Sequence, residues 1–176
     1  MGFRAVGHGY RVHMLQFMKG SADAINSTHG EYNAIGAVPG FSYENTTHYE
    51  WRELIDDSDG DEQQAKTDGA LRRTRKLLRG ASDADLGQPI ELNSDPAQGF
   101  HMLILDEILY AVEQGQLNPL IVEKLIETKP PNLELVLTGS HTKPTYIESI
   151  ADVITEVNKN KHLFDEGVQA RSGTEY

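Results

Sequence analysis

The stretch His101-Met-Leu-Ile-Leu-Asp-Glu-Ile-Leu-Tyr110 decides the fold of this chain. Its apolar residues 102–105 run without interruption into the acidic pair Asp106-Glu107. Such a run is typical of a central strand in a parallel sheet that is covered on both faces. Open α/β sheets place their ligands at the carboxyl ends of such strands, and acidic pairs hold Mg²⁺ there in many nucleotide-binding proteins. The alternative is that Asp106 only caps a helix that begins near Glu107.

Strands and helices alternate on both sides of this segment. The expected strands are residues 11–15, 31–38, 133–139 and 152–157, and the expected helices are residues 62–79, 107–113, a stretch that begins at Asn118-Pro119, and residues 145–151. Alternation at this spacing predicts an α/β fold with a mostly parallel sheet and flanking helices. Residues 80–99 are rich in Asp, Gly, Pro and Ser, and we interpret them as a loop insertion within a single domain that spans residues 1–176.

Right-handed crossovers between parallel strands bring the carboxyl ends of the strands to one edge of the sheet. That edge would collect residues 16–20, Asp106-Glu107 and Thr138-Gly139. We therefore expect the ligand site of this chain to lie there.

The composition narrows the class of protein. The chain has 176 residues, enough for one domain with a substantial core. The formal charge of −11 disfavours a nucleic-acid-binding surface, which would need a basic patch, and it is also compatible with adaptation to high salt. The absence of cysteine excludes disulfides and thiolate metal sites and is compatible with a cytoplasmic location. No apolar run approaches the roughly 20 residues that span a bilayer, so we expect no membrane insertion.

Two further patterns each allow two interpretations. Phe41, Tyr43, Tyr49 and Trp51 are unusually dense, and their alternation predicts a half-buried strand unless they form part of a site. The second half of the helix at 62–79 is basic. Such a run is usually a solvated face at a helix C-terminus, and binding of phosphate or of a partner is the alternative. The basic residues are Arg72, Arg73, Arg75, Lys76 and Arg79.

Several common site motifs are absent from the sequence. The seven histidines contain no close ligand pair such as HExxH, which argues against a histidine metal site. No serine lies in a recognisable nucleophile elbow, and no GxxxxGK[ST] phosphate loop occurs.

Six blocks in order resemble the P-loop-type corrinoid adenosyltransferases. They are Arg4-Ala-Val-Gly-His-Gly9, Gln16-Phe-Met-Lys-Gly20, Gly40-Phe-Ser-Tyr43, Leu105-Asp-Glu107, Leu137-Thr-Gly139 and Lys161-His-Leu-Phe-Asp-Glu-Gly-Val-Gln-Ala170. The closing Gly173-Thr-Glu-Tyr176 resembles the family's carboxyl terminus, whereas residues 80–99 match no block of the family.

This resemblance implies a P-loop NTPase (RecA-like) architecture and a reaction. The adenosyl group of ATP would move to a reduced corrinoid, either cob(I)alamin or cobinamide, with release of triphosphate, in adenosylcobalamin synthesis or salvage. The resemblance also implies Mg²⁺ (Mg2+) as cofactor, an electron donor that reduces cobalt, and a homodimer as a common assembly. Because Co(I) itself attacks the ribose C5′ carbon, the protein needs no nucleophile and instead orients the substrates and neutralises charge.

The resemblance also assigns roles to residues. Phe41 and Tyr43 match the aromatic residues of a G-F-[ST]-W pattern that displaces the corrinoid's lower ligand, with Tyr43 in place of tryptophan. Glu107 matches the Mg²⁺-linked carboxylate, and Asp106 lies beside it. The residues matched to nucleotide binding are Arg4, Lys19 and Thr138. His162, Phe164 and Asp165 lie in the most family-specific block and receive no role.

One departure from the family concerns the phosphate loop. The family's first strand and Gly-Lys-rich loop would precede Arg4, and this sequence starts at Met1. We expect a longer native protein, with genuine truncation as the alternative, and we expect the 176 residues alone to be less stable and to have little or no activity. The competing function is a non-catalytic corrinoid- or nucleotide-binding module. A fragment of an unrelated P-loop ATPase is a more distant alternative, because it would not explain the block at Gly40-Phe-Ser-Tyr43.

Overall fold

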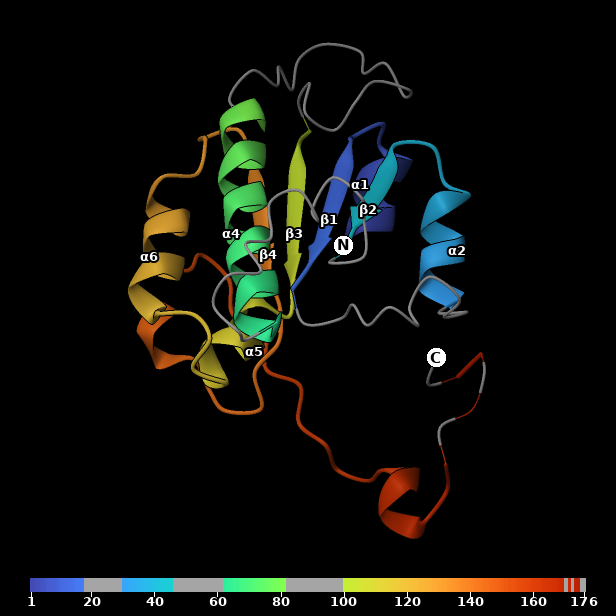
Figure 1. The fold of residues 1–176 in the computed structure, drawn as a ribbon. Coiled ribbons are helices and arrows are strands. Elements are labelled where there is room, and N and C mark those ends of the chain that lie inside the picture. The colour runs from blue at the N-terminus through green and yellow to red at the C-terminus, as the bar shows by residue number, and fades with distance from the viewer. Residues whose placement is uncertain (18–29, 46–61, 82–99, 170, 172, 175–176) are drawn as a thin grey trace.

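The computed structural model describes residues 1–17, 30–45, 62–81, 100–169, 171 and 173–174. Its centre is a four-stranded sheet in the order β2-β1-β3-β4, in which every neighbouring pair is parallel (Figure 1). The strands are β1 (Val12–Gln16), β2 (Phe41–Glu44), β3 (Met102–Asp106) and β4 (Glu134–Leu137). The α/β fold with a parallel sheet is therefore confirmed, and the stretch that starts at His101 supplies its central strand.

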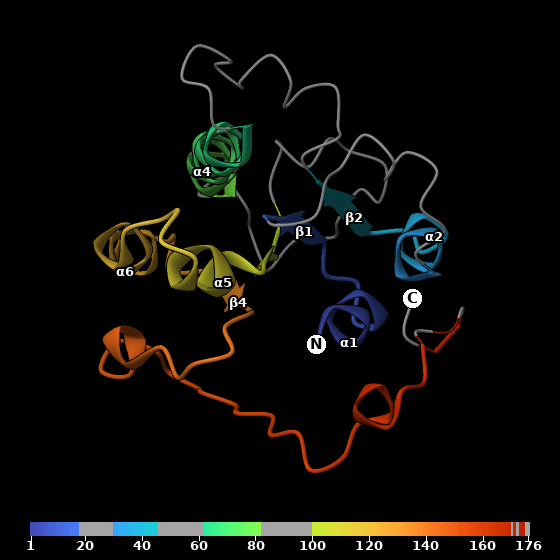
Figure 2. The same ribbon diagram turned by 60° about the horizontal axis from the view of Figure 1, so that its bottom comes forward.

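The sheet is flanked by α-helices and by two short 3-10 helices. The α-helices are α1 (Gly2–Gly7), α2 (Gly30–Gly36), α4 (Glu62–Ala81), α5 (Ile108–Glu113) and α6 (Pro119–Glu127). The 3-10 helices are η4 (Thr145–Ile147) and η5 (Leu163–Glu166). Figure 2 shows α4 over one face of the sheet and α1 under the other. None of the helices in the described part of the chain is both long and apolar enough to cross a bilayer.

Alternation along the strands divides the core between the two faces. In β3, Leu103 and Leu105 pack into the core formed with α4, α5 and α6, whereas Met102 and Ile104 belong to the core formed with α1 and α2. Successive strand residues point to opposite faces, so an uninterrupted apolar run is required where both faces are covered. This requirement explains the composition of the stretch that decides the fold.

Several expected helices are confirmed. The helix at 62–79 is present as α4 and continues to Ala81, and the helix at 107–113 is present as α5. Asn118 caps α6 as expected, because its side-chain oxygen accepts a hydrogen bond from the Leu120 N–H at 3.0 Å. Local capping chemistry was therefore a sound guide to helix starts.

Three expectations about secondary structure were wrong or too long. Residues 31–38 are not a strand, because α2 occupies Gly30–Gly36 and buries Tyr32 and Ile35, three positions apart, on one face. Only one 3-10 turn forms within residues 145–151. Residues 152–157 form no strand: Val153 and Val157 are 83% and 91% exposed, and β propensity alone does not hold an unpaired segment in a sheet. Most of the expected loop insertion, residues 82–99, lies outside the described residues.

Candidate functional site

Three strands end together around the carboxylate of Asp106. Gln16, the last residue of β1, pairs in register with Asp106 at the end of β3, and its Nε2 donates to Asp106 Oδ2 at 2.8 Å. Thr138 directly follows β4, and its hydroxyl donates to Asp106 Oδ1 at 2.7 Å. Both carboxylate oxygens are therefore held by neighbouring strands, and the predicted gathering of residues 16, 106–107 and 138–139 at one edge is confirmed. Residues 18–20, which complete that prediction, lie outside the described residues.

Glu107 adopts a backbone conformation that non-glycine residues rarely adopt. Its φ is 62°, in the left-handed region, and its N–H donates to Thr138 Oγ1 at 3.0 Å. Gly139 lies against this backbone: a Cβ added to Gly139 would be 3.0 Å from Glu107 Cα and 3.0 Å from Tyr110 N. The left-handed conformation costs about 1–2 kcal/mol, and such strain often concentrates at functional sites. The surrounding contacts thus maintain a strained carboxylate-bearing residue beside Asp106.

The alternative role of Asp106 as a helix cap is not observed. Glu107 occupies the N-cap position of α5, and no side-chain hydrogen bond caps this helix. The carboxylate of Asp106 instead accepts hydrogen bonds from Gln16 and Thr138. Its position therefore favours a role at the edge of the sheet.

Two aromatic rings lie next to this edge. Tyr43 of β2 stacks on Tyr32 of α2, with ring centroids 4.8 Å apart and planes at 10°. The Tyr32 hydroxyl donates to Gln16 Oε1. Neither Tyr32 nor Gln16 was singled out from the sequence as a site residue. Gln16 belongs to one of the blocks that resemble the family. Tyr32 lies in residues 31–38, which were expected to form a strand, so no signal in the sequence pointed to it.

Phe41 lies elsewhere in the fold. It pairs in register with Val12, the first residue of β1, and is only 8% exposed. Its ring packs edge-on against Phe3 at 5.3 Å and also contacts Gly2, where an added Cβ would be 2.7 Å from the phenyl ring. The structure therefore brings Tyr43 toward Asp106 but leaves Phe41 in the core at the other end of the strands.

Two residues expected to bind the nucleotide remain, and the structure describes one of them. Arg4 is exposed on α1, a helix that packs on β1 and β2. Lys19 lies outside the described residues. In the tail, His162 Nδ1 accepts from the Phe164 N–H at 3.1 Å, and Asp165 pairs with Lys159 at 2.8 Å. These tail contacts are local and give no site role.

The acidic pair fits a Mg²⁺ ion that takes its other ligands from water and from substrate phosphates. Within the described ranges, no cluster of three or more His, Asp or Glu side chains could hold a metal ion. Mg²⁺ commonly uses only one or two protein carboxylates and takes its other ligands from water and substrate phosphates. Asp106 and Glu107 offer that donor set. Among the described residues, no set of side chains would hold the ion without such additional ligands.

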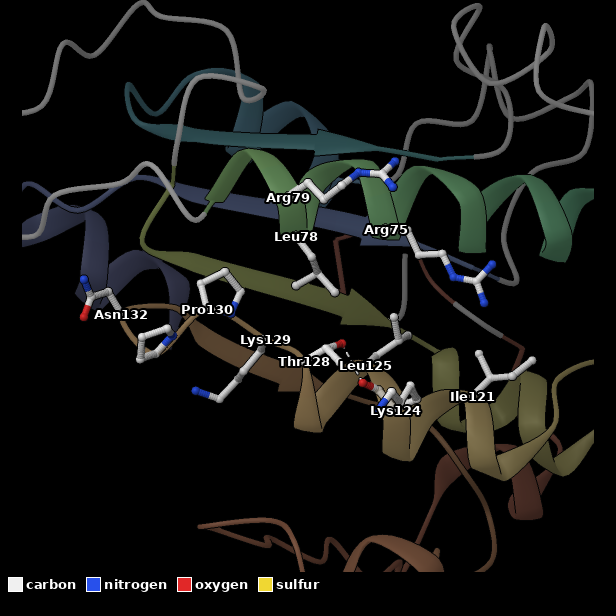
Figure 3. Close-up of a pocket in the computed structure, with 11 residues that line it drawn as sticks. Arg75, Leu78, Arg79, Ile121, Lys124, Leu125, Thr128, Lys129, Pro130 and Asn132 are labelled. Atoms are coloured by element: carbon white, nitrogen blue, oxygen red, sulfur yellow. Dashed lines mark hydrogen bonds between the residues drawn. The ribbon is translucent and has the colours of Figure 1, made fainter.

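The basic residues of α4 lie in different environments. Arg73 is buried, at 4% exposure, and donates to both carboxylate oxygens of Glu44, so the expectation of a solvated face is wrong for this residue. Arg75 and Arg79 line a groove of about 730 Å³ between α4 and α6 (Figure 3). Figure 3 shows their guanidinium groups and the Lys129 ammonium pointing in different directions. Because these cations do not converge, we assign no ligand to the groove.

Burial raises the pKa of the Tyr32 phenol from 10.0 to about 12. The folded protein thus holds this proton more tightly than the unfolded chain does. Below pH 10 the phenol is protonated in both states, and between pH 10 and about 12 the unfolded chain loses its proton first, so stability falls as pH rises. We expect this fall to be larger in wild type than in Tyr32→Phe by on the order of 2–3 kcal/mol.

Urea unfolding followed by circular dichroism across this pH range measures the difference. Tyr10→Phe, which removes a hydroxyl from a tyrosine that is 43% exposed, is the matched control and should retain the wild-type slope. Equal slopes for wild type and Tyr32→Phe would contradict the prediction.

Comparison with known proteins covers the whole chain. Residues 1–176 match the family model described as ATP:corrinoid adenosyltransferase BtuR/CobO/CobP. A corrinoid adenosyltransferase of Pseudomonas aeruginosa is 30% identical over 98% of this chain and 73% of the relative. One of Sinorhizobium sp is 30% identical over 100% of this chain and 72% of the relative. One of Escherichia coli K12 is 28% identical over 98% of this chain and 74% of the relative.

Proposed function

Because the chain belongs to the ATP:corrinoid adenosyltransferase family, we propose that it transfers the adenosyl group of ATP to a reduced corrinoid at the carboxyl edge of its sheet. The observation that carries the proposal is the Asp106 carboxylate, held on both oxygens by Gln16 and Thr138 and followed by the strained Glu107. A rigid acidic pair at that edge suits the charge neutralisation that triphosphate release requires.

Each residue near the carboxyl edge of the sheet would have a separate role in binding Mg²⁺ and ATP. Asp106 and Glu107 would hold Mg²⁺, which lowers the charge repulsion of the triphosphate when it is bound. Thr138 fixes both members of the pair, through the Asp106 carboxylate at 2.7 Å and the Glu107 N–H at 3.0 Å. Arg4 and Lys19 remain the proposed additional contacts to the nucleotide. Orientation of C5′ over cobalt then follows from where these groups hold the triphosphate.

Tyr43 and Phe41 are the proposed aromatic contacts to the corrinoid. Tyr43 is supported by its stacking on Tyr32, whose hydroxyl donates to Gln16 beside Asp106. Phe41 is buried against Gly2 and Phe3, so it would reach a corrinoid only if α1 and the start of β2 separated. Substitution of Tyr43 should therefore affect corrinoid binding directly, whereas substitution of Phe41 should first affect the core.

The proposal also includes the expected partners and location. ATP and a corrinoid are the substrates, an electron donor reduces the cobalt, a homodimer is the expected assembly, and the cytoplasm is the expected compartment. Neither nucleic acid nor a membrane is a proposed partner, in keeping with the net charge of −11. The reaction at the carboxyl edge of the sheet would be the same in the synthesis and in the salvage of adenosylcobalamin.

An anaerobic assay with ATP, Mg²⁺ and cob(I)alamin tests the proposed function. Adenosyl transfer that requires both ATP and Mg²⁺ is the expected result. Glu107→Gln should lower kcat about 10²–10³-fold, the usual loss for one charge-stabilising group. Glu127→Gln, an identical change at an exposed position of α6, is the matched control.

Two results would each remove a part of this proposal. Unchanged kcat in Glu107→Gln would contradict the assignment of the acidic pair. Binding of ATP and of the corrinoid without turnover would favour the non-catalytic binding module.

A further inference from the structure

A continuous line of buried and partly buried contacts joins the aromatic pair to the acidic pair. Tyr43 stacks on Tyr32 at 4.8 Å, and the Tyr32 hydroxyl donates to Gln16 Oε1. Gln16 Nε2 donates to Asp106 Oδ2 at 2.8 Å. From there the line continues through Thr138, whose hydroxyl donates to Asp106 and accepts from the Glu107 N–H. Residues of α2, β1, β2 and β3 and the end of β4 are thereby joined.

The orientation of the Gln16 amide follows from its two neighbours. An ionised carboxylate only accepts hydrogen bonds, so the amide nitrogen must face Asp106. The amide oxygen then faces Tyr32, and a phenol can donate to it. Gln16 is 1% exposed, so a rotated amide would place its oxygen, in a buried position and without a donor, against the Oδ2 atom of Asp106. Gln16 thus has one favourable arrangement, and this arrangement requires both neighbours.

The burial of this polar line sets it apart from surface contacts. Tyr32 is 7% exposed and Gln16 is 1% exposed, so water cannot readily replace the hydrogen bond between them. The hydrogen bond from Gln16 to Asp106 is partly buried. Hydrogen bonds in such surroundings polarise one another, and a change at one end alters the next bond in the line. Movement of the Tyr43–Tyr32 stack would therefore change how firmly Asp106 is held.

We propose that Gln16 is a positioning residue for the Asp106 carboxylate, and that Gln16 and Tyr32 together couple corrinoid contact at Tyr43 to Mg²⁺·ATP binding at Asp106 and Glu107. This inference rests on the proposed function. It adds that each substrate changes the affinity of the other through a specific pair of side chains. The coupling must be reciprocal, because the same free energy links the two binding steps in either order.

Calorimetric titration of the full chain with cobalamin, with and without Mg²⁺·ATP, tests the coupling. The ratio of the two cobalamin dissociation constants is the coupling factor, and couplings between sites are typically about 5–150-fold. We expect Tyr32→Phe and Gln16→Leu to bring this ratio within about twofold of one.

Tyr146→Phe is the matched control for Tyr32→Phe. The Tyr146 hydroxyl is also buried, and it has no hydrogen-bond partner in the part of the chain that the structure describes. Its removal should leave the coupling factor at the wild-type value. A coupling factor in Tyr32→Phe equal to that of wild type and Tyr146→Phe would overturn the proposal.

A second measurement needs no ligand. In ¹⁵N-labelled protein, the side-chain amide signals of Gln16, identified by their loss in Gln16→Leu, should shift in Tyr32→Phe and in Thr138→Val but not in Tyr146→Phe. Unshifted signals in Tyr32→Phe and Thr138→Val would overturn the positioning role.

The two measurements separate the two possible failures. If wild type binds no cobalamin while the amide signals shift as expected, the proposed function fails and the coupling fails with it, but Gln16 still positions Asp106. If both substrates bind and the coupling factor is insensitive to Tyr32→Phe, the proposed function stands and the coupling is wrong.

Discussion

Replacement of Arg73 by methionine is expected to lower the free energy of unfolding by about 3–5 kcal/mol. Arg73 of α4 donates from Nε to Glu44 Oε2 at 2.7 Å and from Nη2 to Oε1, and both side chains are less than 10% exposed. The same carboxylate lies 3.4 Å from His13 Nε2. Loss of the guanidinium would leave a buried carboxylate without its main positive partner, which costs far more than the pair contributes.

Urea unfolding followed by circular dichroism measures this effect, and the chain provides its own control. Arg75→Met changes an exposed arginine two positions along the same helix, and it should alter stability by no more than about 0.5 kcal/mol. The double variant Arg73→Met/Glu44→Gln should recover part of the loss, because no buried charge remains uncompensated. A loss in Arg73→Met no greater than in Arg75→Met would show that the ion pair does not hold α4 on β2.

Replacement of Gly139 by alanine is expected to cost about 2–3 kcal/mol of stability and to lower adenosyl transfer about 10²-fold. The φ of Gly139 is 102°, which side-chain-bearing residues rarely adopt, and an added Cβ would be 3.0 Å from Glu107 Cα and 3.2 Å from Tyr110 Cβ. The backbone of Glu107 must therefore move, and the carboxylate moves with it. Catalysis is sensitive to displacements of this size, because orientation supplies much of the rate enhancement.

Gly115→Ala is the control that separates the cost of a positive φ from the cost of a steric clash. Gly115 has a φ of 73°, but an added Cβ there would meet nothing within 4 Å. This control should lose only about 1 kcal/mol from the left-handed conformation and should retain its activity. Thermal unfolding and the cob(I)alamin assay, applied to both variants, measure the difference. A Gly139→Ala protein with the stability and activity of Gly115→Ala would contradict the importance of this contact.

Local patterns were reliable where one short segment determines its own structure. The run at residues 102–105 indicates a strand covered on both faces, and β3 has this environment. The Asn118-Pro119 pair predicts a helix start because a side-chain oxygen and a fixed φ act within one turn. Both predictions depend on residues at most a few positions apart.

Local patterns failed where packing decides between two structures. Residues 31–38 have strand-like content, but Tyr32 and Ile35, three positions apart, share the buried face of α2. Val153 and Val157 have high β propensity, yet they stay exposed because a strand forms only where a neighbour completes its hydrogen bonds. Phe41 likewise matched a site motif, but its environment depends on Gly2 and Phe3, which precede it by almost forty positions.

By itself, the sequence determined the fold class, the strand that ends in Asp106-Glu107, the edge at which Thr138-Gly139 would join it, and the likeness to the corrinoid adenosyltransferases. The tertiary structure alone decided how the carboxylate is held. Gln16 reaches Asp106 across 90 positions of sequence, and Tyr32 reaches Gln16 from a helix that was expected to be a strand. The physical reason is that strand formation and capping depend on neighbours along the chain, whereas the orientation of a buried carboxylate depends on donors from other strands, which come together only after the sheet has formed.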